Sequence, residues 1–164
     1  MIWLSVMVLV AFLAISVLGT RRASMIFAGT RLVCICGATL FVANLFVALT
    51  AIFGGIALAM GVDKFPSAWL VGTPFRSYLI PGLILAVVVG GSAAFATITT
   101  LRRAATGALA SMLAGAILLG WLVGERVILP AAAFPTQFSW LEAVYIAAGL
   151  LMVVPALMAR RTAL

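Results

Sequence analysis

YLIPGLILAVVVGGSAAFATITTL, residues 78–101, is a long apolar stretch that carries no charged side chain. A helix of about 20 such residues crosses the hydrocarbon core of a bilayer. Small residues recur in the stretch at strict four-residue spacing, at Gly82, Ala86, Gly90 and Ala94. Small residues four apart let the backbones of two membrane helices approach closely. The stretch therefore predicts a transmembrane helix with a packing face of small residues.

The composition of the whole chain is that of a membrane protein. Of the 164 residues, 66% are hydrophobic and 8% are charged, whereas roughly 25% are charged in soluble domains. A water-soluble fold could not bury so much apolar surface, so the lipid bilayer must surround most of it. We expect residues 1–164 to form one all-α transmembrane domain.

Charges and prolines divide the chain into five apolar stretches, each long enough to cross a bilayer. We predict a helical bundle of five spans, at about residues 2–18, 32–61, 78–101, 104–124 and 140–159. The first stretch lacks the preceding positive charge of a cleaved signal peptide, so we expect it to be retained. Ser77 is the predicted N-cap of the third span, and Gly54-Gly55 is the expected bend of the second.

The charged residues predict the orientation of this bundle. One side would carry basic residues without any acid: Arg21, Arg22, Arg31, Arg102, Arg103, Arg160 and Arg161. The other side would carry both signs: Lys64, Arg76, Arg126, Asp63, Glu125 and Glu142. The tryptophans would form a belt on this second side: Trp3, Trp69, Trp121 and Trp140. The positive-inside rule then places the N-terminus outside and the C-terminus in the cytoplasm.

Several classes of chemistry are excluded or not expected. The chain has no histidine, which excludes histidine-based catalysis and haem ligation by imidazole. Cys34 and Cys36 point to nearly opposite sides of a helix, so they cannot share a metal or form a relaxed disulfide. No basic stripe interleaved with aromatics is present, so nucleic acid is not an expected partner. We predict no catalytic residue, cofactor or metal.

Two polar residues inside the spans are candidates for a functional role. Asn44 lies near the middle of the second span, where it would either bond a neighbouring helix or line a solute path. Glu142 lies just inside the fifth span, and it too has a structural and a functional interpretation. With Ser139 it forms a capping-box pattern, which uses its carboxylate at the helix start. Alternatively, it binds a proton or a ligand.

The fourth span also carries small residues four apart. Gly107, Ser111 and Gly115 share one face, and Gly120 and Gly124 follow. One interpretation is that the third and fourth spans pack on each other within one chain. The other is that these faces dock onto another subunit.

Residues 73–82, TPFRSYLIPG, resemble a pattern of small uncharacterised polytopic membrane proteins of bacteria, especially actinobacteria. In these proteins a Thr-Pro-Phe outer loop leads through Ile-Pro-Gly into a glycine-rich span. Ser139-Trp140-Leu141 is similar to the start of their final span. The resemblance implies a multi-pass protein of the bacterial plasma membrane, and it implies no activity or cofactor.

The sequence favours a non-enzymatic membrane protein that acts by helix packing, as an accessory or assembly subunit of a complex or as a homo-oligomer. The alternative is a small-solute or ion transporter whose path lies near Asn44, Glu142 and the Gly90-Gly91-Ser92 break. A third hypothesis is a membrane enzyme with an outer-face site. That site would be built from Asp63, Arg76, Glu125 and Arg126.

Overall fold

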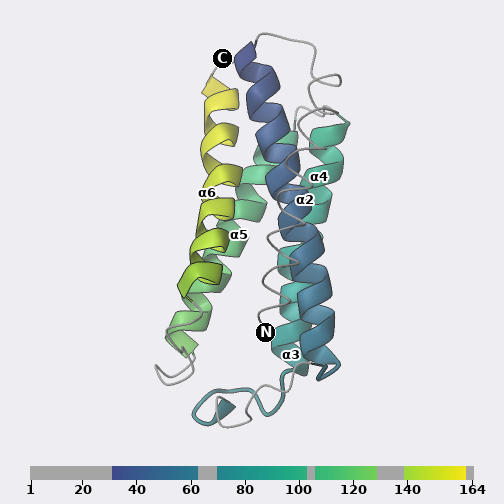
Figure 1. Ribbon diagram of the computed structural model, residues 1–164, viewed down its shortest axis with the longest axis vertical. Helices are drawn as coiled ribbons and strands as arrows, with labels where there is room; N and C mark the ends of the chain where they lie inside the picture. Colours follow the sequence, from purple (N-terminus) through teal and green to yellow (C-terminus); the bar gives the residue numbers. More distant parts are fainter. Residues whose placement is uncertain (1–30, 63–69, 103–105, 129–138, 162–164) are drawn as a thin grey trace.

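Four long helices make up the described part of the chain (Figure 1). The computed structural model describes residues 31–62, 70–102, 106–128 and 139–161. The elements are α2 (Arg31–Ala59), α3 (Leu79–Leu83), η2 (Ile84–Gly90), α4 (Gly91–Leu101), α5 (Gly107–Ile128) and α6 (Ser139–Arg161). Because α3, η2 and α4 follow one another directly, they form one continuous helix.

All four helices are long and apolar enough to cross a membrane, judged by length and composition. They correspond to the second to fifth predicted spans, so the described part of the chain is all-helical and of the multi-pass membrane type. The predicted first span, residues 2–18, lies outside the described residues. Successive helices run in opposite directions, which gives the bundle two ends (Figure 1). We name them the Thr106 end, where α5 begins, and the Trp140 end, where α6 begins.

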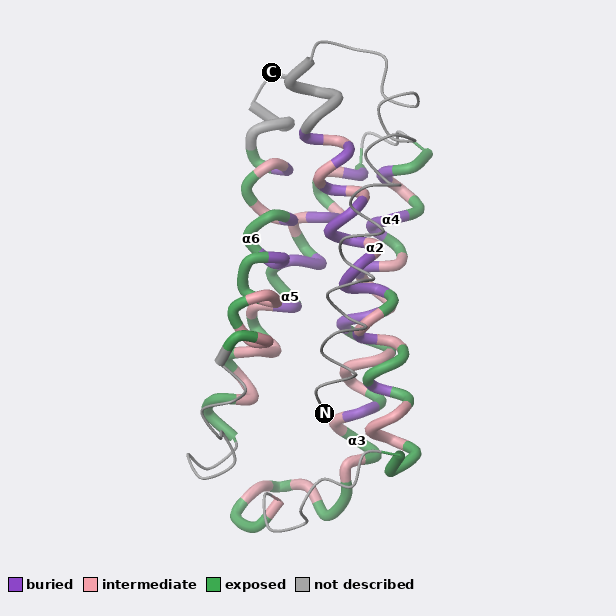
Figure 2. The backbone as a smooth tube through the Cα atoms, in the orientation of Figure 1, coloured by how far each residue is buried: buried purple, intermediate pink, exposed green. Residues whose placement is uncertain are grey.

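The helix at the centre of the bundle is α2. It contacts every other described helix, and buried positions gather along it (Figure 2). Phe46 and Val47 in its middle are completely buried. A helix that is apolar on all sides has no natural solvent face and is expected in a core. The sequence of α2 carries no charge after Arg31, in agreement with its central position.

At the Trp140 end, α2 stops in a Schellman motif. The Val62 N–H donates to the Ala57 carbonyl at 3.0 Å, and the Gly61 N–H donates to the Leu58 carbonyl at 3.2 Å. Gly61 has a φ of 66°, a left-handed conformation that costs glycine little. The helix passes through Gly54-Gly55 without interruption, so these glycines do not divide it.

The third span begins one residue later than predicted, at Leu79. Its N-cap is Tyr78, and no side chain caps the helix, so the prediction of Ser77 as N-cap is wrong. Pro81 lies in the first turn, where its missing N–H is tolerated because the first four N–H groups of a helix have no intrahelical partner. The chain before it turns at Thr73, whose hydroxyl donates to the Leu70 carbonyl at 2.8 Å.

The π-helical segment η2 explains the four-residue spacing of the small residues in this span. In a regular α-helix, residues four apart drift around the axis by about 40° per step. The i→i+5 bonds of a π-helix put more residues into each turn, which reduces this drift. Gly82, Ala86 and Gly90 therefore stay on the face that meets α2.

The fourth span ends later than the predicted residue 124, because α5 continues to Ile128. Glu125 and Arg126 therefore lie in the last turns of the helix and not beyond its end. Both charges have partners there. Trp121 Nε1 donates to Glu125 Oε1 at 2.8 Å on the same helix, and Arg126 pairs with Glu142 of α6. These bonds lower the cost of continuing the helix past the apolar sequence.

Candidate functional sites

The small residues of the third span lie against α2. A Cβ on Gly55 would come 2.5 Å from the Gly82 carbonyl oxygen and 2.8 Å from the Ala86 Cβ. A Cβ on Gly90 would come 2.6 Å from Ile52. Gly55 and Gly82 thus form a backbone-to-backbone contact. The third and fourth spans do pack on each other within the chain, because α4 contacts α5. The face with Gly82 and Gly90, however, meets α2, and Ala94 is partly buried against the core.

The small residues of α5 meet two different helices. A Cβ on Gly107 would come 3.1 Å from the Thr100 Cα of α4. One on Gly115 would come 2.9 Å from the Met152 Cβ of α6. In contrast, no described atom lies within 4 Å of a Cβ built on Gly120 or Gly124. The predicted stripe is therefore divided into an occupied half and an open half.

Asn44 is completely buried and joins α2 to α5. Its Nδ2 donates to Ser111 Oγ at 2.9 Å and to the Leu40 carbonyl at 2.6 Å. Ser111 Oγ in turn donates to the Gly107 carbonyl at 2.9 Å and lies 3.3 Å from Thr100 Oγ1. We name Asn44, Thr100 and Ser111 the Asn44 cluster. It connects α2, α4 and α5 through side chains.

The hydrogen atoms of the Asn44 cluster are all engaged. Ser111 has one hydroxyl hydrogen, which goes to Gly107, so Thr100 must be the donor in the Thr100–Ser111 bond. Asn44 uses both amide hydrogens, while its buried Oδ1 has no partner among the described residues. A buried polar atom left unpaired costs about 1–3 kcal/mol. The cluster therefore bonds three helices together but is not fully satisfied.

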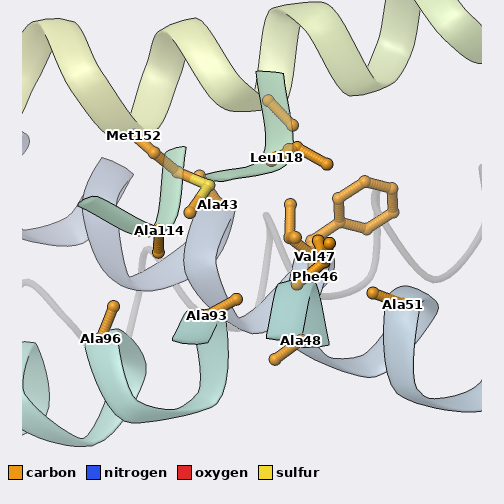
Figure 3. Close-up of a cluster of buried hydrophobic side chains, with 12 residues drawn as sticks. Ala43, Phe46, Val47, Ala48, Ala51, Ala93, Ala96, Ala114, Leu118 and Met152 are labelled. Atoms are coloured by element: carbon orange, nitrogen blue, oxygen red, sulfur yellow. The ribbon is translucent and has the colours of Figure 1, made fainter. Parts of the chain in front are cut away.

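The side chains packed next to this cluster are apolar. Figure 3 shows Met152 of α6 reaching between Ala43 of α2 and Ala114 of α5. Leu118 and Phe46 continue the same core toward the Trp140 end. The two candidate polar residues therefore do not share a site: Asn44 bonds to Ser111, and Glu142 bonds to Arg126.

Glu142 belongs to a second polar group at the Trp140 end. Arg126 Nε donates to Glu142 Oε1 at 2.6 Å, and Arg126 Nη2 donates to Glu142 Oε2. Both carboxylate oxygens of Glu142 therefore accept hydrogen bonds from Arg126 of α5. The capping-box interpretation did not include this partner. The Ser139 side chain lies outside the described residues.

Next to this ion pair, Glu125 bonds to an aromatic side chain. Trp121 donates to its carboxylate, and Tyr145 of α6 is close enough to interact with it electrostatically. The Tyr145 ring stacks on Phe46 with centroids 6.0 Å apart, and its hydroxyl interacts with the Thr50 side chain. We name Trp121, Glu125, Arg126, Glu142 and Tyr145 the Glu125 cluster.

The four charges proposed for an outer-face enzyme site are not seen together. Glu125 and Arg126 are neighbours in the Glu125 cluster, whereas Arg76 is exposed in the turn before α3. Asp63 lies outside the described residues. Within the described residues, no group of three or more His, Cys, Asp or Glu side chains could hold a metal ion.

Sequence reasoning missed the contributions of Trp121 and Tyr145 to this cluster. The signal for Trp121 was present, since residues four apart on a helix face one another and Trp121 and Glu125 have that spacing. No local signal points to Tyr145, because its approach to Glu125 depends on how α5 and α6 pack.

No protein-family model, curated protein or solved structure matches this chain. Functional conclusions therefore rest on the contacts within the described residues.

Proposed function

We propose that this chain is a non-enzymatic integral membrane protein that acts by helix packing. It serves as an accessory or assembly subunit of a membrane complex, or it forms a homo-oligomer. It lies in the plasma membrane of a bacterium, with five spans and its N-terminus outside. The observation that supports this proposal is the open half of the small-residue stripe on α5.

The glycines of the described helices fall into two groups. The first group lies so close to another helix that an added Cβ would clash with it, so packing within one chain accounts for these glycines: Gly55, Gly82, Gly90 and Gly115. Gly120 and Gly124 have no such neighbour, and the apolar side chains beside them are exposed, Val123 by 63% and Val127 by 79%. Glycines four apart on an apolar helix face permit close approach of a further helix.

The experiment compares the assembly of matched glycine variants. We expect Gly120→Leu together with Gly124→Leu to reduce the complex or oligomer to a monomer, because leucine prevents close helix approach. Gly54→Leu is the control, since Gly54 also lies mid-helix with no atom near its built Cβ. Masses of the tagged full chain are read by native mass spectrometry after extraction in mild detergent. A wild-type chain that is monomeric and without partners would contradict the proposal.

We propose transport of a small solute or ion as the second candidate function. The observation that favours it is the unpartnered Oδ1 of Asn44 in the middle of the bundle, because polar groups inside membranes often mark solute paths. The test is flux into proteoliposomes, with Asn44→Leu and Glu142→Gln as variants. If neither substitution changes any flux, this candidate fails.

A further inference from the structure

Two carboxyl groups and one guanidinium meet near the Trp140 end, in the Glu125 cluster. Arg126 donates through Nε and Nη2 to the two carboxylate oxygens of Glu142. Glu125 is bonded differently, because its hydrogen bond comes from the neutral indole N–H of Trp121, at 2.8 Å. The guanidinium is thus directed at one carboxyl group, while the other receives an uncharged donor.

The position of Glu125 makes a negative charge on it costly. Its side chain is half-buried in the last turns of a helix that is apolar up to this point. Glu142 of α6 is close enough for its charge to repel a charge on Glu125. A carboxylate that leaves water without a cation bonded to it takes up a proton instead, and two carboxylates that share a site do not both ionise readily. The geometry therefore favours a neutral Glu125 beside an ionised Glu142.

The other groups that interact with Glu125 do not reverse this preference. Arg126 attracts its charge, but two nitrogens of this guanidinium are bonded to Glu142. Tyr145 of α6 interacts with Glu125 through a neutral phenol, and Thr50 of α2, which contacts Tyr145, carries no charge. Among the described residues that interact with Glu125, Arg126 supplies the one positive charge.

We propose that Glu125 is a proton-binding site whose charge controls the link between α5 and α6. With the proton bound, Glu125 is neutral and the guanidinium of Arg126 stays on Glu142. When the pH rises and the proton leaves to water, the new carboxylate repels Glu142 and competes with it for Arg126. The link between the two helices then loosens at the Trp140 end. The inference does not rest on the proposed association through α5.

Nuclear magnetic resonance of the full chain in detergent micelles measures the proton directly. The chain has two glutamates, Glu125 and Glu142, so glutamate that is isotope-labelled at the side-chain carboxyl carbon gives two signals. Glu125→Gln removes one signal and thereby assigns both. We expect the Glu125 signal to titrate at a pH at least about one unit above that of Glu142.

Trp121→Phe tests the role of the indole donor in the same measurement. The N–H bond stabilises the ionised carboxylate of Glu125, so its loss should move the Glu125 titration to a pH about 0.5–1 unit higher than in the wild type. Trp140→Phe is the matched control, because Trp140 is exposed on α6 and is not a member of the cluster. It should leave the titration unchanged.

Pulsed electron spin resonance measures the link between the helices. Spin labels are attached through Val127→Cys on α5 and Ile146→Cys on α6, two exposed positions, in a chain that lacks Cys34 and Cys36. We expect the distribution of distances between the labels to broaden as the pH rises through the titration. Glu125→Gln mimics the protonated group, so its distribution should stay narrow over the same pH range.

Three results would overturn the proposal. The first is a Glu125 signal that titrates together with that of Glu142 or below it. The second is a distance distribution that does not change with pH, and the third is a pH response that persists in Glu125→Gln. Circular dichroism at each pH checks that the helices remain folded, so these results report on the cluster and not on unfolding.

Discussion

Asn44 bonds through its nitrogen to α5 and to its own helix, and within the described residues its oxygen is unpaired. Its amide hydrogens go to Ser111 and to the Leu40 carbonyl. Ser111 is more central to the Asn44 cluster, because its oxygen accepts from both Asn44 and Thr100 while it donates to Gly107. The two residues should therefore respond differently to substitution.

We expect Ser111→Ala to lower the free energy of unfolding by about 1–2 kcal/mol, because the buried amide hydrogen of Asn44 loses its acceptor. Asn44→Leu should cost less, within about 1 kcal/mol, since it removes an unpaired oxygen and keeps the branching and the number of side-chain heavy atoms. Unfolding in mixed detergent micelles measures both variants. Thr99→Val is the control, because the Thr99 hydroxyl bonds only to carbonyls of its own helix. If Asn44→Leu is the more damaging substitution, the unpaired oxygen has a role that these contacts do not explain.

The contact between α2 and the α3–η2 segment depends on the absence of side chains at two glycines. Gly55 and Gly82 face each other, and the two atoms nearest to an added Cβ at each glycine are backbone atoms. Backbone atoms cannot move aside as the end of a flexible side chain can. At the adjacent Gly54, no described atom lies within 4 Å of an added Cβ.

This contrast predicts opposite outcomes for two neighbouring alanine substitutions. Gly55→Ala should lower the free energy of unfolding by about 1–3 kcal/mol, because overpacking forces the two helices apart. Gly54→Ala should leave it unchanged or raise it by up to about 1 kcal/mol, because alanine favours the helix more than glycine. Thermal unfolding in detergent compares the two. Equal effects of the two substitutions would show that the close approach does not stabilise the bundle.

At the same scale, the existence of the helices was easier to predict than their partners. Residues 78–101 were predicted closely, since apolar length and the flanking arginines mark both ends. The prediction failed where tertiary contacts decide the outcome. Arg126 lies within α5, where it pairs with Glu142 of α6. Gly82 meets Gly55 of α2, although the small residues of the fourth span were the more evident partner in the sequence. Hydropathy specifies a lipid-facing helix, but it does not specify which helix lies beside it.

The same limit applies to the candidate site. Asn44 and Glu142 stood out because polar side chains are rare within the spans, but their partners Ser111 and Arg126 depend on how α2 and α6 pack on α5.

Across the whole molecule, the described helices place their charges at both ends of an apolar bundle. Glu125, Arg126 and Glu142 lie at the Trp140 end, while Arg102 follows the end of α4 at the Thr106 end. Trp121 and Trp140 also lie toward the Trp140 end, in agreement with a belt on that side. The number of spans and the side on which each end lies remain predictions from the sequence.

Cysteine labelling of intact cells tests the orientation. In a background without Cys34 and Cys36, we expect Ser77→Cys to react with a membrane-impermeant maleimide and Thr106→Cys to react only after the cells are opened. Both positions are exposed in the structure, so a difference in labelling reports the side of the membrane. The reverse pattern would place the N-terminus in the cytoplasm.

The bond between Asn44 and Ser111 has a consequence for synthesis. Ser111 follows Asn44 by 67 residues, so at about 5–20 residues per second the ribosome reaches it roughly 3–13 seconds later. During that interval α2 is already made while its polar partner does not yet exist. The amide can meanwhile donate to the Leu40 carbonyl of its own helix. This local bond lets the newly made helix enter lipid before the hairpin that completes the Asn44 cluster has been translated.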